Sequence, residues 1–228
     1  MFSRMRQIAL PVGLTPSVAA LVLANLVPLA GALWLGWQVG DVVLLYWIEN
    51  LIVGGLNIAR MLAVRIRDPA AWLGKLVLIP FFAVHFGGFA AVHGVLLIAM
   101  FHEQGSTVPA ALDATHIDSV IMLVPQLLWG TLSHALSQRA IAYGAITLTV
   151  SHGVSFVVNF LGAGEYRSAT LQELMSRPYR RVILLHLVLI GSGFLLLLIG
   201  TPTAGLVLMV LMKVGFDIVA HRKEHAEK

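Results

Sequence analysis

The chain contains no cysteine among its 228 residues, and charged side chains make up only 11% of it. Without thiols it cannot form disulfides, thiolate metal sites, iron–sulfur clusters or a covalently attached c-type haem. A soluble domain carries about 25% charged residues, so this chain has too few polar side chains to cover a water-exposed surface. The shortage of charge excludes an ordinary soluble domain and favours a protein whose outer surface contacts lipid.

Apolar residues take the place of the missing charge. They account for 58% of the chain, and the mean hydropathy is +0.88. A transmembrane helix needs about 20 apolar residues, so about six or seven helices with short connections use nearly the whole length. We therefore predict an all-α fold, a polytopic transmembrane helix bundle that forms one domain over residues 1–228. The net charge of +4 does not indicate nucleic-acid binding, because the basic residues gather at the predicted helix ends.

Hydrophobic runs separated by proline, glycine and polar residues predict the individual helices. The expected full crossings are 16–37, 42–64, 72–101, 141–162, 181–200 and 202–221. We expect the first to be retained rather than cleaved, because its apolar run is longer than the core of a signal peptide.

Basic residues predict the orientation of these helices in the bilayer. Lys and Arg gather in the first seven residues and in 60–75, 167–181 and 222–228, whereas the connection 102–118 has none. If the segment 119–137 does not fully cross, every basic cluster lies on the cytoplasmic side. We therefore predict six full crossings plus one re-entrant or interfacial segment at 119–137, with both termini cytoplasmic; seven crossings are the alternative.

Ionisable and amide side chains recur inside these spans, where a charged group costs about 3 kcal/mol or more. Those expected toward the outer half are Glu49, His85, His93 and His152. Those expected toward the cytoplasmic half are Asn57, Arg60, Asn159, His186, Asp217 and His221. Four positions of one helix share a face, namely Asn50, Gly54, Asn57 and Met61.

Histidine or carboxylate brought inward by several helices indicates a metal or haem site, although such residues can also simply bond helices together. In a protein without thiols, zinc, iron and copper bind imidazole and carboxylate. The predicted metal ligands are His85, His93, His152, His186, Asp217, His221 and His225. Glu49 and Lys213 are the predicted catalytic side chains. The predicted polar interior comprises Asn50, Asn57, Arg60, Ser155, Asn159, Glu165 and Arg167.

Spacing limits how these ligands combine. His85 and His93 are eight residues apart, about 12 Å along a helix, so we expect one metal to take only one of them. We expect His93 nearer Glu49 and His85 nearer His152. The pattern His221-x-x-Glu224-His225 matches the inverted zinc-protease signature, but its place in a basic C-terminal tail argues against a protease.

Several motifs resemble those of a bacterial membrane family without an assigned activity. They are Tyr46-Trp47-Ile48-Glu49-Asn50, the segment from His85 to Gly94, Ser151-His152-Gly153, Gly164-Glu165-Tyr166-Arg167 and the ending from Asp217 to His225. The resemblance covers residues 42–225 and implies a multi-pass protein of the bacterial inner membrane.

The chain is more loosely similar to the seven-helix zinc amidohydrolases of the alkaline ceramidase and adiponectin-receptor type. The last helix of those enzymes carries a His-x-x-x-His pair, and His221 and His225 match it in spacing. Their Ser-x-x-x-His pair is missing here, because Phe81 stands four residues before His85.

Three functions remain open at this point. We favour a metal-dependent membrane enzyme in which zinc, iron or copper, held by histidine and carboxylate, activates water or oxygen toward a lipid-like substrate. The second is an electron-transfer protein with haem b between histidines of different helices and quinone as its partner. The third is a transporter of protons, metal ions or small solutes, with Glu49, Lys213 and Asp217 as binding or relay groups. The lack of a clear internal repeat weakens the third.

Overall fold

The structure, a computed structural model, describes residues 39–66, 69–101 and 120–179, together with isolated positions between 182 and 211. Every regular element within these residues is helical. The predicted crossing at 16–37 and the connection 102–118 lie outside the described residues. So do four of the predicted site residues, Lys213, Asp217, His221 and His225.

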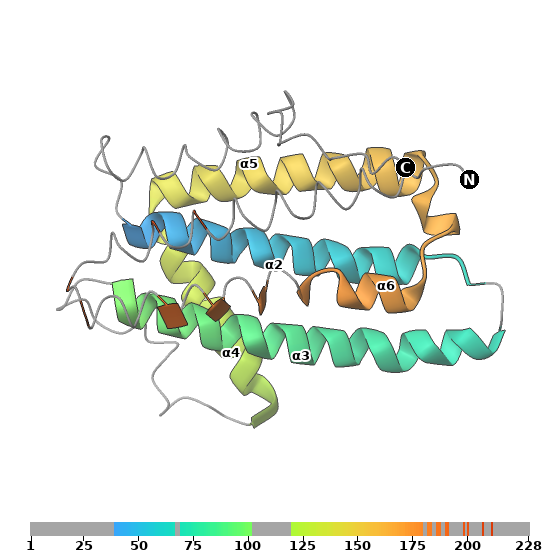
Figure 1. Cartoon of the computed structure of the whole chain (residues 1–228), viewed down its shortest axis with the longest axis horizontal. Coiled ribbons are helices and arrows are strands. Elements are labelled where there is room, and N and C mark those ends of the chain that lie inside the picture. The colour runs from blue at the N-terminus through green and yellow to red at the C-terminus, as the bar shows by residue number, and fades with distance from the viewer. Residues whose placement is uncertain are drawn as a thin grey trace, which may run out of the picture.

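Three long helices lie side by side: α2 (Val39–Ala63) is flanked by α3 (Pro69–Phe101) and α5 (Arg139–Ser155), as Figure 1 shows. The π-helix η3 (Phe156–Gly162) continues α5. Within the described residues, three helices are long and apolar enough to cross a membrane, over Gly40–Ala63, Trp72–Phe101 and Arg139–Gly162. These correspond to the crossings predicted at 42–64, 72–101 and 141–162, and the all-helical fold is confirmed for the described part of the chain.

Glycine lets α2 and α3 approach each other closely. A Cβ added at Gly54 would lie 2.2 Å from Phe86 Cε1, and one added at Gly94 would lie 2.7 Å from Trp47 Cζ2. Trp47 also donates from Nε1 to the carbonyl of Ala90 at 2.8 Å. Small residues that admit a neighbouring side chain or backbone are characteristic of helix packing in membranes, where burial from water supplies no driving force.

The C-terminal end of α2 is capped by a side chain of α3. Lys75 is 6% exposed, and its Nζ donates to the carbonyls of Leu62 at 2.6 Å and Val64 at 2.8 Å. The last carbonyls of an α-helix have no partner inside the helix and carry partial negative charge, so a cation is favoured there. Lys75, predicted only as one of the charges that set orientation, therefore also holds the α2–α3 connection.

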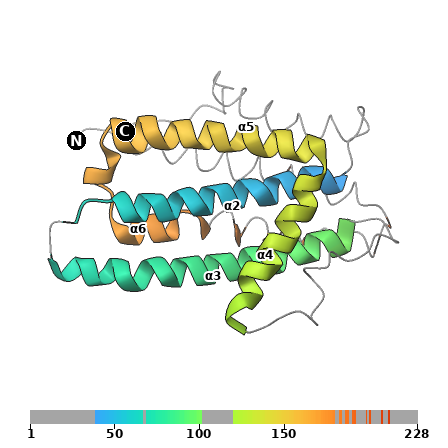
Figure 2. The ribbon, with the colours of Figure 1, turned by 180° about the vertical axis from the view of Figure 1, so that it is seen from behind.

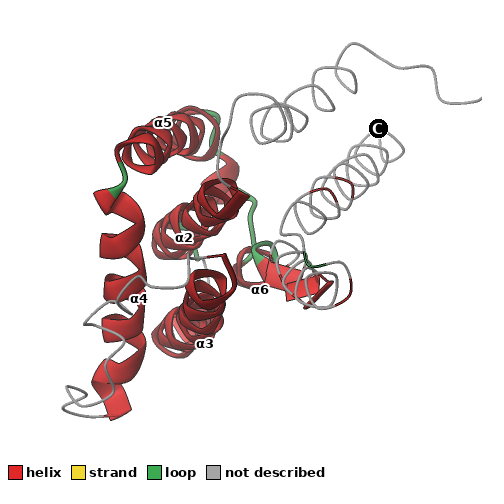
Figure 3. Ribbon diagram, turned by 90° about the vertical axis from the view of Figure 1, so that its left-hand side faces the viewer, coloured by secondary structure: helices red, strands yellow, loops and turns green. Residues whose placement is uncertain are grey.

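The helix α4 (Val120–Ser137) runs in a different direction from the other three. Figure 3 views α2, α3 and α5 nearly end-on while α4 lies across the view, and Figure 2 shows the same helix passing obliquely over α3. It packs on α3, with Val124 and Leu128 close to Gly87. The element expected at 119–137 therefore exists as a transverse helix, and the number of crossings stays a prediction.

A short helix precedes the crossing predicted at 181–200. α6 (Leu171–Ser176) opens with a capping box in which Glu173 N donates to Thr170 Oγ1 and Thr170 N to Glu173 Oε2, both at 3.2 Å. Asn57 Nδ2 donates to the Leu174 carbonyl at 2.7 Å, so α6 lies against α2. We predicted no helix over residues 163–180, because we weighed the arginines of that stretch and overlooked the Thr-x-x-Glu capping signal.

Candidate functional site

The predicted catalytic residue Glu49 is paired with a histidine across the α2–α5 interface. His152 Nε2 lies 3.2 Å from Glu49 Oε1, and the side chains are 26% and 12% exposed, respectively. Inside a bilayer each group lowers the cost of burying the other. A carboxylate and an imidazole at this distance can also share or exchange a proton.

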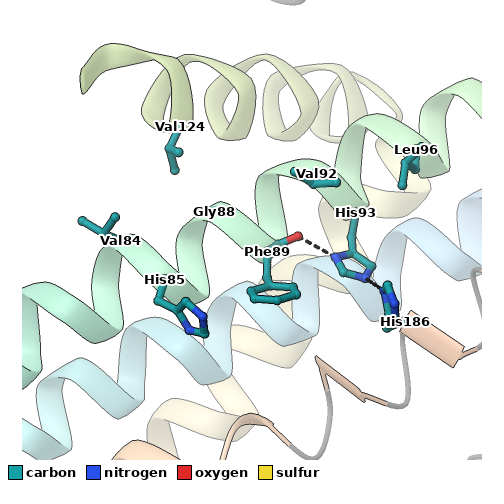
Figure 4. A pocket seen from close by; sticks show the side chains of 9 residues that line it. All are labelled: Val84, His85, Gly88, Phe89, Val92, His93, Leu96, Val124 and His186. Atoms are coloured by element: carbon teal, nitrogen blue, oxygen red, sulfur yellow. Dashed lines mark hydrogen bonds between the residues drawn. The ribbon is translucent and has the colours of Figure 1, made fainter. Parts of the chain in front are cut away.

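Two predicted metal ligands are in direct contact. His93 is 2% exposed, and its Nε2 lies 3.1 Å from Nδ1 of His186. Its other ring nitrogen, Nδ1, lies 2.5 Å from the carbonyl of Phe89, which can only accept a hydrogen bond. A neutral His93 therefore carries its proton on Nδ1 and directs the lone pair of Nε2 toward His186. Figure 4 shows both contacts.

The third histidine of this region, His85, has a tyrosine as its partner. Its Nδ1 lies 2.7 Å from the hydroxyl of Tyr179, and its ring is stacked on Phe81 with centroids 5.2 Å apart. Tyr179 was not among the predicted site residues, because it lies in the stretch that we expected to be a loop. The local signal nearest to it was the capping box at Thr170, which begins α6.

A groove of about 490 Å³ runs along α3 beside these histidines (Figure 4). Val84 and Val92 on its wall are 68% and 55% exposed, so the groove opens on the outer face of the described helices. The polar side chains among its lining residues are all imidazoles. It is lined by Val84, His85, Gly88, Phe89, Val92, His93, Leu96, Val124 and His186. Such a groove suits a molecule that is largely apolar with a few polar atoms.

The structure corrects the predicted arrangement of these residues. We expected Glu49 near His93 and His85 near His152, but Glu49 contacts His152 and His93 contacts His186. We also expected His186 in the cytoplasmic half. His186 instead lies at the level of His93, because the ring nitrogens of the two residues are in contact.

The described residues hold no group of three or more His, Asp or Glu side chains that could bind a metal ion. His93 and His186 supply two ligand atoms, while His85 and His152 face other partners. The remaining predicted ligands belong to residues 217–225, outside the described part of the chain.

Two amide side chains of α2 that were predicted to be interior are buried. Asn50 and Asn57 are 4% and 1% exposed on the face that also carries Met61. Arg60 is half-buried, and its guanidinium carbon lies 5.7 Å from the ring centroid of Phe156. The amide oxygen of Asn50 has no hydrogen-bond partner among the atoms that the structure describes.

Four other residues predicted to be interior are instead exposed, namely Ser155, Asn159, Glu165 and Arg167. The wider turn of η3 changes the register of the helix after Ser155, so Phe160, 1% exposed, faces the bundle instead of Asn159. Glu165 and Arg167 lie on a short 3₁₀ turn that follows Gly164, whose φ of 81° suits glycine. A hydrogen bond to the Tyr166 hydroxyl raises the pKa of the Arg167 guanidinium.

The comparisons with known proteins agree with a family that has no assigned activity. A family model described as "Family of unknown function (DUF6498)" matches residues 9–228. No curated protein and no solved structure matches the chain.

Proposed function

We propose that this chain, which belongs to the family of unknown function whose model matches residues 9–228, is a membrane enzyme that uses a transition metal on a lipid-like substrate. His93 and His186 hold the metal in this proposal, and the groove along α3 takes the apolar part of the substrate. The observation that carries the proposal is the pair of facing ring nitrogens 3.1 Å apart beside that groove.

The distance between the two nitrogens suits a shared metal. Zinc–nitrogen bonds are about 2.0–2.1 Å long, so two ligands at a tetrahedral angle are about 3.3 Å apart. The separation of 3.1 Å needs only a small opening to reach that value. The hydrogen bond from His93 to the Phe89 carbonyl supports the same role, because metal-ligating histidines commonly donate their other N–H to a carbonyl or carboxylate.

The same geometry argues against a haem bound between His93 and His186. Two axial histidines lie on opposite sides of the iron, so their nitrogens are about 4 Å apart with the porphyrin between them. The His93 and His186 rings have centroids only 5.2 Å apart and planes inclined by 68°. A small ion between them fits this arrangement better than a macrocycle does.

A catalytic zinc site usually has three protein ligands and an open position for water. Asp217, His221 and His225 remain the predicted sources of the third ligand. Metal-bound water with a pKa of about 7 is a nucleophile for an ester, amide or phosphoester of a lipid. His85, on the same groove wall as His93, is suited to bind a polar atom of the substrate. Glu49 does not line the groove, so we assign it no part in this reaction.

Metal content of the purified protein tests the proposal. We expect about one zinc, iron or copper ion per chain as purified, strongly reduced in His93→Ala and in His186→Ala, whose weakened sites refill only with added metal, and retained in His85→Ala, the matched control from the same groove. A parent protein without metal after growth in supplemented medium would contradict it.

A proton-coupled transporter is the second candidate, and the Glu49–His152 pair favours it. A carboxylate–imidazole pair between spans is the usual element of a proton relay. This candidate predicts a pH-dependent solute flux in proteoliposomes that Glu49→Gln abolishes. If the protein is the metal enzyme instead, no such flux is expected.

We further propose six crossings in a bacterial inner membrane, with both termini cytoplasmic and α4 at the outer interface. The transverse direction of α4 supports this arrangement, as does the distribution of basic residues.

A further inference from the structure

A half-buried arginine lies between α2 and the π-helix η3, near the basic end of the bundle. The guanidinium carbon of Arg60 is 5.7 Å from the ring centroid of Phe156 and 5.8 Å from that of Phe160. The two rings stabilise the cation and hold its plane, and they leave the N–H edge available. Within the described residues, no hydrogen bond or ion pair engages the Arg60 guanidinium.

A second arginine is held nearby. Arg177 directly follows α6, and its positive charge is close enough to repel that of Arg60. The Glu165 carboxylate attracts Arg60, but less strongly than Arg177 repels it. The hydrogen bond from Asn57 to the Leu174 carbonyl, 2.7 Å long, fixes α6 to α2 three residues from each arginine. The backbone therefore brings the two arginines to the same end of the bundle, where an anion bound between them would offset their repulsion.

We propose that Arg60 and Arg177 bind a phosphate group at this end of the bundle. The planar fork of arginine matches the oxygens of phosphate, and a pair of arginines can share one phosphate. The site lies one helical turn from the end of the candidate span Gly40–Ala63, where lipid headgroups begin. The phosphate belongs either to an anionic phospholipid or to a soluble phosphate compound, since both present the same oxygens.

Thermal unfolding of the detergent-purified full chain tests this site and identifies the source. The probes are dioctanoyl phosphatidic acid, dioctanoyl phosphatidylcholine and inorganic phosphate. Arg177→Gln is the test variant because Arg177 is exposed, and Arg139→Gln, an exposed arginine at the start of α5, is the matched control. Arg60→Lys keeps the charge and removes the fork.

We expect phosphatidic acid to raise the unfolding temperature saturably, and phosphatidylcholine not to do so. Arg177→Gln should weaken the apparent affinity by roughly fivefold or more, Arg60→Lys should weaken it too, and Arg139→Gln should not. The same pattern with inorganic phosphate would support the site and assign it to a soluble ligand. No saturable shift, an equal shift with phosphatidylcholine, or equal losses in Arg177→Gln and Arg139→Gln would overturn the proposal.

Discussion

Alanine at Gly54 and at its neighbour Gly55 tests how closely α2 packs on α3. A Cβ at Gly54 would lie 2.2 Å from Phe86 Cε1, whereas a Cβ at Gly55 would meet nothing within 4 Å. The Phe86 ring has little freedom to move aside, because it is 5% exposed and stacked on Phe82 with centroids 5.0 Å apart. It also meets the edge of Tyr179, at a centroid distance of 6.4 Å.

The expected difference in stability between the two variants follows from two opposing effects. Overpacking a well-filled interface costs about 1–3 kcal/mol, whereas Gly→Ala inside a helix gains about 0.5–1 kcal/mol. The helix gain is common to both variants, so Gly54→Ala should be less stable than Gly55→Ala by about 1–3 kcal/mol. Unfolding of the two detergent-purified variants by heat and by SDS titration measures this difference. Equal stabilities would refute the packing of Gly54 on the Phe86 ring.

Two further predictions follow from the described contacts and a third from the expected topology of 119–137. Lys75→Met removes the two hydrogen bonds of 2.6 and 2.8 Å that the buried lysine donates to the end of α2. The free energy of unfolding, measured by SDS titration, should fall by about 2–4 kcal/mol. No change would mean that the lysine does not cap α2. Single and double alanine substitutions of Glu49 and His152 should be non-additive by about 0.5–3 kcal/mol in a stability cycle, and additive effects would contradict their pairing. Cysteines introduced at Asp113 and Gln138 should both react with an impermeant thiol reagent from outside, and labelling at Asp113 alone would mean that α4 crosses the membrane.

Much of the bundle could be predicted because a bilayer imposes length and apolarity on every span. The prediction of 72–101 differs from α3 by three residues at one end, and 42–64 differs from α2 by similar amounts. The start of α6 was missed because hydropathy describes only the apolar part of a helix. Its first turn is polar, and its signal is the Thr170–Glu173 capping box, a local hydrogen-bonding pattern.

The site was predictable in its residue types but not in its pairings. Histidine and glutamate inside spans stand out in any sequence because each is costly there. Which of them meet depends on the depth and rotation of each helix, and those depend on contacts between helices such as that of Gly54 with Phe86. The sequence placed His186 at the cytoplasmic level, so its contact with His93 was not predicted.

X-ray absorption at the edge of the bound metal tests the central claim most directly, because it counts the imidazole ligands and measures their distances. For the parent protein, the account predicts at least two imidazole nitrogens at about 2.0–2.1 Å. It predicts one fewer in His186→Ala reconstituted with the same metal, and an unchanged count in His152→Ala, whose histidine faces Glu49. The account would be contradicted if His186→Ala had the same number of imidazole ligands as the parent protein. It would also be contradicted if the parent's metal had no imidazole ligand.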